Sequence, residues 1–126
     1  MDNNALQGIT ILVAEDEYML ATDLAKELAN AGSRVLGPVP SLDAALDLID
    51  AADKIHAAIL DVSLQDEKVF PAADMLAAKG VPFLFATGYD QSLIPPRYSE
   101  VLRCEKPIGA VSLIRAVRAI IEKARS

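Results

Sequence analysis

Cysteine and histidine are nearly absent from this 126-residue chain, which holds one of each, Cys104 and His56. A single cysteine cannot form an internal disulfide, so a small secreted scaffold held by disulfides is excluded. One cysteine and one histidine are also too few for a metal cluster built on thiolate and imidazole ligands. Both exclusions follow from residue counts alone.

Long apolar runs are missing as well. No run approaches the roughly 18 apolar residues that a membrane span needs, and Val81–Ala86 is among the longest. The first four residues, 1–4, contain no basic residue and no apolar segment follows them, so no signal peptide is visible. We therefore expect a cytoplasmic protein with no membrane partner.

Basic residues are outnumbered, with 12 Lys and Arg against 18 Asp and Glu, which gives a formal net charge of −6. A net acidic domain repels phosphate backbones, and this disfavours a nucleic-acid partner. The length fits one domain, with about two-thirds of the unfolded surface buried. We expect a short N-terminal tail over residues 1–8 and a single, monomeric domain over residues 9–126, with no output domain.

Segments rich in apolar and β-branched residues alternate with helical patterns five times. The predicted strands are Ile9–Ala14, Arg34–Leu36, Ala57–Leu60, Val81–Ala86 and Val101–Cys104. Gly32 and Gly80 are expected to end helices, Ser41 to cap one, and Gly37-Pro38 to end the second strand. A polar loop over 63–68 and a short helix around 91–94 complete the pattern. Strict alternation favours a doubly wound parallel sheet covered by helices on both faces.

Chemically useful side chains follow four of these strands. Glu15 and Asp16 follow the first strand, Asp61 the third, Thr87 the fourth and Lys106 the fifth. In an open parallel sheet, ligands bind beyond the carboxyl ends of the strands, so we expect these side chains to meet at one edge.

Such a group of residues suits phosphoryl transfer. Neighbouring carboxylates repel one another and require a cation, and oxygen ligands favour Mg²⁺ over zinc. Asp61 can accept a phosphoryl group, while Lys106 and the Thr87 hydroxyl can neutralise or bond its oxygens. Phosphoryl transfer depends mostly on this kind of positioning and charge neutralisation.

The same residues resemble those of the receiver domain of two-component response regulators, over Ile9 to about Ala124. The matching pieces are Glu15-Asp16, Asp61, Thr87-Gly88 and Lys106-Pro107. The resemblance implies a flavodoxin-like (CheY-like) (βα)5 fold with a five-stranded parallel sheet of order 2-1-3-4-5. It also implies a cis peptide bond before Pro107, in keeping with the low energy of cis X–Pro bonds.

The resemblance further implies roles for individual residues. Asp61 would take the phosphoryl group from a histidine kinase or a histidine phosphotransfer protein, assisted by Thr87 and Lys106. Asp16 and Asp61 would bind Mg²⁺ by their side chains, Ser63 by its backbone carbonyl, and Glu15 through water. The protein would then be a phosphoacceptor that signals by protein contact or acts as a phosphate sink, not an enzyme.

A narrower resemblance lies in Pro82–Tyr89, which is similar to the PFxFATGY signature of the FAT GUY receivers. That class implies a stand-alone receiver paired with a kinase of the HWE or HisKA2 type. One position departs from ordinary receivers, because Arg103 stands where a switch aromatic is usual, three residues before Lys106. We therefore hypothesise that the switch lies in the segment 87–98, with Tyr89 a candidate, and we expect Tyr98 to be a surface ring.

Three other functions compete with this interpretation. A Mg²⁺-dependent phosphatase with an Asp nucleophile would usually carry an acid at the position of Ser63, and a cap segment as well. A mononucleotide-binding module would carry a hydroxyl- and glycine-rich loop after the first strand, where the chain has three acids at 15–17. A pseudo-receiver is disfavoured by the presence of Asp61, Thr87 and Lys106.

Overall fold

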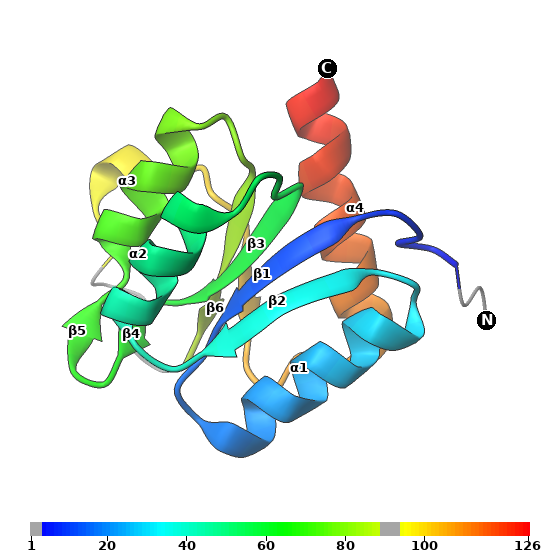
Figure 1. Ribbon diagram of the computed structural model, residues 1–126, viewed down its shortest axis with the longest axis horizontal. Helices are drawn as coiled ribbons and strands as arrows, with labels where there is room; N and C mark the ends of the chain where they lie inside the picture. Colours follow the sequence, from blue (N-terminus) through cyan, green and yellow to red (C-terminus); the bar gives the residue numbers. More distant parts are fainter. Residues whose placement is uncertain (1–3, 89–93) are drawn as a thin grey trace.

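A computed structural model describes residues 4–88 and 94–126 (Figure 1). Its helices and strands alternate along the chain, except that two short strands follow the third strand directly. In order they are β1 (Thr10–Ala14), α1 (Tyr18–Asn30), β2 (Arg34–Val39), α2 (Leu42–Ala51), β3 (Ala57–Asp61), β4 (Ser63–Leu64), β5 (Glu67–Lys68), α3 (Phe70–Ala78), β6 (Phe83–Thr87), the 3₁₀ turn η2 (Pro96–Tyr98), β7 (Arg103–Glu105) and α4 (Ala110–Arg125).

The main sheet has five parallel strands in the order β2-β1-β3-β6-β7. Counting only these strands, this is the predicted flavodoxin-like order 2-1-3-4-5, and the predicted fold class is confirmed. Helices α1 and α4 cover one face, and α2 and α3 cover the other (Figure 1). All five strands run the same way, so their carboxyl ends lie along one edge of the sheet.

Each face of the sheet carries its own apolar layer. Alternate residues of the central strands point to opposite faces, so Leu12 and Leu60 pack against α2 and α3. Ile11 and Ile59 pack against α1 and α4 on the other side. All four side chains are fully buried, which explains why these strands read as continuous apolar runs.

The second strand extends further than expected. Strand β2 continues through Gly37 and Pro38 to Val39, so the prediction that this dipeptide ends the strand is wrong. Gly37 has a φ of +97°, and a Cβ atom there would lie 2.8 Å from the carbonyl oxygen of Val13. Glycine therefore lets β2 stay beside β1 through the register shift between Leu12 and Ala14.

The segment before β1 is not a loose tail throughout. Leu6 is 1% exposed and packs in the layer formed with α1 and α4. Its backbone N–H donates to the carbonyl oxygen of Ala31 at 2.9 Å. Burial of the Leu6 side chain and one main-chain hydrogen bond thus fix this segment, although its sequence shows no hydrophobic periodicity.

Two connections at the carboxyl edge also differ from the predictions. The expected polar loop after Asp61 is an antiparallel hairpin of β4 and β5. In the connection from β6 to β7, the described residues form a 3₁₀ turn over Pro96–Tyr98. The short helix predicted around 91–94 falls largely on residues 91–93, which lie outside the described residues. Within the ranges 4–88 and 94–126, no helix is long and apolar enough to span a membrane.

Candidate functional site

The topology brings the predicted acidic residues together. Glu15 and Asp16 directly follow β1, and Asp61 is the last residue of the neighbouring strand β3. One carboxylate oxygen from each of the three residues can be chosen so that all lie within 4.8 Å of one another. Glu15 and Asp61 are buried, whereas Asp16 is exposed. The acidic cluster therefore has two buried members and one that is exposed to solvent.

Lys106 reaches this acidic cluster from the loop after β7. Its Nζ donates to Asp61 Oδ2 at 2.8 Å and lies 2.8 Å from Glu15 Oε1 as an ion pair. Burial alone would lower the pKa of Lys106, but its bonds to Asp61 and Glu15 outweigh burial and raise that pKa. The ammonium therefore remains charged, and it is the one cation bonded to this group of three acidic side chains among the residues that the structure describes.

Glu15 is the most deeply buried of the three acids, at 2% exposure. Its Oε2 accepts a bond from the backbone N–H of Glu17 at 3.1 Å. Burial raises the pKa of Glu15 to about 7, although the bond to Lys106 acts in the opposite direction. Near neutral pH, this carboxyl therefore takes up a proton readily when no additional positive charge is present.

Thr87 ends strand β6, one residue after Ala86, which pairs with Asp61. Its side chain is buried, and its Oγ1 has no hydrogen-bond partner among the residues that the structure describes. The Thr87 carbonyl accepts from the Lys106 N–H at 2.9 Å, which links the two strand ends. Buried hydroxyls without a partner are rare, so this one is available to an incoming oxygen. The peptide bond between Lys106 and Pro107 is cis, as predicted.

The hairpin after β3 supplies main-chain donors to two of the acids. The Ser63 N–H donates to Asp61 Oδ1 at 3.3 Å, and the Gln65 N–H donates to Asp16 Oδ2 at 2.8 Å. Ser63 thus lies next to the acidic cluster, where its carbonyl is predicted to bind a metal. The pattern of residues contained no signal for the Gln65 contact, because it depends on a turn conformation.

The donor set fits a hard divalent cation. It consists of carboxylate oxygens, with an excess of negative charge over the single ammonium of Lys106. Mg²⁺ binds through one or two carboxylates and keeps several waters, so it needs a partly open site. Asp16 provides that open side, because its side chain is exposed and holds its carboxylate next to Asp61.

Of the two switch candidates, Arg103 and Tyr89, the structure describes only the first. Arg103 is an exposed residue of the edge strand β7, and Tyr89 lies outside the described residues. Tyr98, expected on the surface, is only 7% exposed. Its ring packs against the rings of Phe70, Phe83 and Phe85, with centroids 6.2, 5.5 and 5.8 Å away. The prediction of a surface ring is wrong because these three rings bury Tyr98.

Three polar side chains form a hydrogen-bonded group at the edge of this aromatic cluster. The Tyr98 hydroxyl donates to Asp74 Oδ1 on α3, and Arg97 binds the same carboxylate through Nε and Nη2 at 3.2 Å each. The bond from Tyr98 and then that from Arg97 lower the pKa of Asp74. We call Asp74, Arg97 and Tyr98 the clasp. The sequence offered a signal only for the aromatic cluster beneath it, since Phe83 and Phe85 alternate along a strand and so share one face.

No family model matches the chain, and no curated protein matches it. Among solved structures, the solution structure of SdrG from Sphingomonas melonis Fr1 is similar over 93% of this chain and 98% of SdrG. The identity is 34% and the TM-score is 0.80.

Two further structures are similar over nearly the whole chain. The BeF3-activated conformation of SdrG from Pseudomonas melonis Fr1 is 30% identical, with a TM-score of 0.74, over 96% of this chain and 99% of that one. A response regulator receiver protein from Sinorhizobium medicae WSM419 is 23% identical, with a TM-score of 0.80, over 94% and 98%. Together with the five-stranded fold, these relatives show that the chain belongs to the receiver domains of response regulators.

Proposed function

We propose that this receiver domain accepts a phosphoryl group on Asp61 in a two-component phosphorelay, with Mg²⁺ as its metal. The observation that carries the proposal is that Asp61 has two kinds of neighbour that phosphoryl transfer needs, a cationic side chain and further carboxylates that can hold a metal. Its Oδ2 is bonded to the ammonium of Lys106, and its carboxylate lies beside those of Glu15 and Asp16. A buried aspartate at a strand end, bonded to a lysine and beside two further acids, favours a role in chemistry over a purely structural role.

In the proposed reaction, an Asp61 oxygen bonds to the phosphorus of the donor as the bond from phosphorus to the donor's leaving atom breaks. Lys106 offsets the charge on the phosphoryl oxygens, and the Thr87 hydroxyl donates to one of them. Asp16 and Asp61 would hold Mg²⁺ by their side chains, with the Ser63 carbonyl as a third ligand and Glu15 acting through water. When bound, the metal supplies further neutralisation of the phosphoryl charge.

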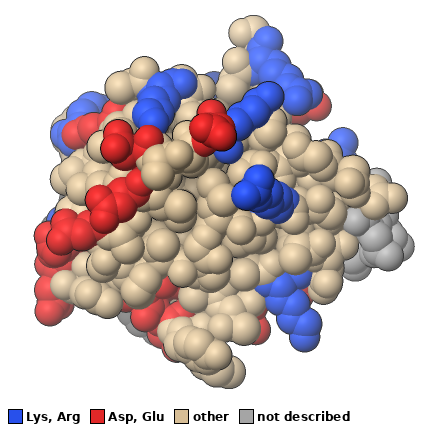
Figure 2. Space-filling model, in the orientation of Figure 1, with Lys and Arg blue, Asp and Glu red and all other residues tan. Residues whose placement is uncertain are grey.

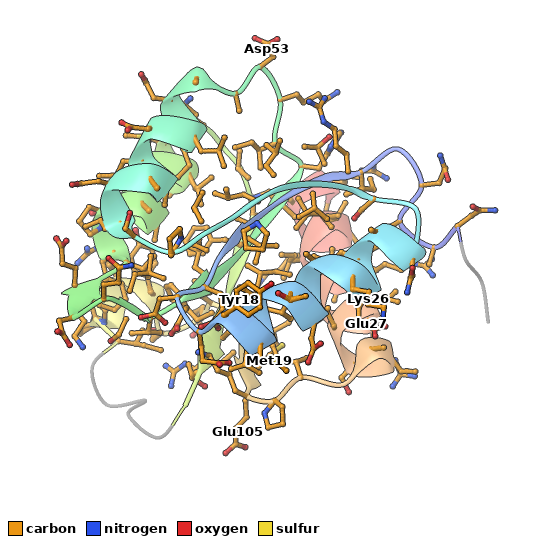
Figure 3. All side chains as sticks on the ribbon, turned by 60° about the horizontal axis from the view of Figure 1, so that its bottom comes forward. Tyr18, Met19, Lys26, Glu27, Asp53 and Glu105 are labelled. Carbon is orange, nitrogen blue, oxygen red and sulfur yellow. The ribbon has the colours of Figure 1, made fainter. Side chains whose placement is uncertain are left out.

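The donor we propose is a histidine kinase, of the HWE or HisKA2 type, or a histidine phosphotransfer protein. The support is the PFxFATGY signature of the FAT GUY class over Pro82–Tyr89 and an apolar surface near the site. Tyr18 and Met19, on the first turn of α1, are 78% and 65% exposed (Figure 3). They follow Asp16 in the chain and offer a surface on which a helix of the donor can pack.

We expect no nucleic-acid partner. Asp43, Asp47 and Asp50 are exposed and, at spacings of four and three residues, share one face of α2. Figure 2 shows acidic side chains in a line over this side of the molecule. Such a surface repels phosphate backbones, and we propose signalling through protein contacts, or a phosphate-sink role, in the cytoplasm.

The switch that follows phosphorylation is proposed to involve the segment 87–98. Thr87, at one end, is a reacting group, and Tyr98, at the other, lies in the clasp. Arg103, in the usual place of the switch aromatic, is exposed and has no ring to turn inward. Because a relative has been solved in a BeF3-activated conformation, beryllofluoride is the natural probe. NMR shifts and relaxation that stay unchanged across this segment on adding it would exclude the switch.

The function is tested by treating the protein with acetyl phosphate and Mg²⁺ and measuring its intact mass. We expect a gain of one phosphoryl group, which Asp61→Asn abolishes. The matched control is Asp53→Asn, because Asp53 is exposed at the opposite end of the molecule (Figure 3). Turnover of a phosphomonoester without any adduct would instead favour the phosphatase alternative.

A further inference from the structure

The β4–β5 hairpin forms one wall of the candidate site. Two of its backbone amides are bonded to acidic side chains, that of Ser63 to Asp61 and that of Gln65 to Asp16. These bonds come from a segment of only six residues, 63–68, placed between the reactive strand end and α3. The hairpin is thus in direct contact with the group that reacts and with the exposed acid beside it.

This wall is held in place by burial. Leu64 is fully buried within the hairpin, as is Val69 directly after it, and Val62, directly before it, is 5% exposed. The Val69 N–H donates to the Val62 carbonyl at 2.9 Å and closes the base of the hairpin. Apolar anchors on β4 and directly before and after the hairpin therefore fix where its polar atoms lie relative to the site.

Lys68 lies on this wall opposite Ser63. The two residues are a cross-strand pair, and Lys68 Nζ donates to Ser63 Oγ at 2.8 Å. An ammonium has only donors, so it occupies a lone pair of the hydroxyl and leaves the hydroxyl proton free to point elsewhere. Asp61 thus has Lys106 bonded to Oδ2 and the backbone N–H of Ser63 bonded to Oδ1, while Lys68 holds the side chain of that same serine.

We propose that Lys68 is a positioning residue for phosphoryl transfer at Asp61, acting through Ser63. It orients the Ser63 hydroxyl so that the proton is available to a phosphoryl oxygen, and it adds positive charge on the side away from Lys106. The inference rests on the proposed function. In phosphorylation, Asp61 displaces acetate from the phosphorus of acetyl phosphate; in hydrolysis, water displaces Asp61 and inorganic phosphate leaves. Both steps place charge on the same phosphoryl oxygens, so Lys68 should accelerate both.

The test compares Lys68→Met with Lys26→Met, a control that removes the same charge from an exposed position on α1 (Figure 3). The gain of phosphate from acetyl phosphate with Mg²⁺, and its loss after the donor is removed, are followed by intact mass. We expect Lys68→Met to slow both rates about 3- to 10-fold, as for loss of one charged hydrogen-bond donor near the reacting group. Lys68→Arg should restore at least half of the rate.

A double-mutant cycle with Ser63→Ala tests the route of the effect. If Lys68 acts through Ser63, Lys68→Met should change the rates less than about 2-fold in the Ser63→Ala protein. Equal rates for Lys68→Met and Lys26→Met would overturn the inference, as would a full effect of Lys68→Met without the serine hydroxyl. If the unmodified protein gains no phosphate at all, the proposed function fails. If it does gain phosphate and the variants match it, only the role of Lys68 fails.

Discussion

Two connections that leave the carboxyl edge of the sheet are held in different ways. The hairpin between β3 and α3 is bonded by its amides to Asp61 and Asp16, so it is tied to charged groups of the site. The described end of the connection between β6 and β7 is held by the ring of Tyr98 in an aromatic cluster and by Asp74 on α3. The first connection can respond directly to charge at Asp61, whereas the second responds to packing.

The two connections nevertheless meet at the start of α3. Phe70, the first residue of α3 and thus the end of the hairpin connection, packs edge-on against Phe85 and stacks on Tyr98. A movement of the hairpin can therefore reach Tyr98 through one aromatic side chain. The site and the clasp therefore share no hydrogen bond among those described above, but Phe70 brings them into contact through packing.

The largest effect on stability is expected from removing the ring of the clasp. Tyr98→Ala leaves a cavity among Phe70, Phe83 and Phe85 and should lower the free energy of unfolding by about 3–5 kcal/mol. Urea unfolding measures this change. Tyr18→Ala, at a ring that is 78% exposed, should change stability by less than about 0.5 kcal/mol. Equal losses in both variants would mean that the second connection is not held by packing.

The charged groups of the site, which the hairpin contacts, are tested by the pH dependence of stability in the absence of metal. Because burial raises the pKa of Glu15 from 4.5 to about 7, the folded protein holds this proton more tightly than the unfolded chain. Its contribution to stability is therefore complete below pH 4.5 and is lost as the pH rises to about 7. Urea unfolding in a chelator should show this decline in the unmodified protein and not in Glu15→Gln. Parallel pH profiles for the two proteins would contradict the assignment.

A smaller loss is expected from removing only the clasp hydroxyl. Tyr98→Phe keeps the ring and deletes its bond to Asp74, which should lower the free energy of unfolding by about 1–2 kcal/mol. In an Asp74→Asn background the same change should have a smaller effect, because the charged acceptor is already gone. The rate of phosphate gain should remain within about 2-fold of the unmodified protein. A larger change in that rate would show that the two connections are coupled in the reaction itself.

The smallest effect concerns the turn of the hairpin. Gln65 and Asp66 both have positive φ values, of 48° and 69°, and such a turn favours glycine at its second position. Asp66→Gly should therefore raise the free energy of unfolding by up to about 1 kcal/mol, as measured by urea unfolding. Asp53→Gly, outside this turn, provides the comparison and should bring no gain. A loss of stability on Asp66→Gly would mean that the aspartate side chain contributes more than the turn conformation.

The position of the site was predictable because it follows from topology. Once five strands alternate with helices, a parallel sheet collects the residues after each strand at one edge, and Glu15, Asp61 and Thr87 needed no knowledge of packing. The clasp was not predictable in this way. The burial of Tyr98 depends on rings from β6 and α3 that are distant in sequence, and a single tyrosine in a polar stretch carries no periodic signal.

Local turn signals were the least informative part of the sequence. Gly37-Pro38 is typical of a strand end, but pairing with β1 carries β2 through it. Gln65-Asp66 contains no glycine, so the hairpin of β4 and β5 had no marker, although its backbone adopts left-handed conformations there. In both places, pairing with a neighbouring strand decides the outcome: glycine supplies the conformation that β2 needs to continue, whereas Gln65 and Asp66 adopt a turn that glycine would favour.

The clasp also gives the protein an optical reporter. The chain contains no tryptophan and three tyrosines, so its near-ultraviolet absorption and emission come mainly from these few phenol rings. Tyr18 is exposed to water, whereas Tyr98 is shielded and bonded to a carboxylate, so the two rings have different spectra. Comparing the protein with Tyr98→Phe isolates the signal of the buried ring. A change in that difference spectrum on phosphorylation would follow the opening or closing of the clasp in real time, without any added label.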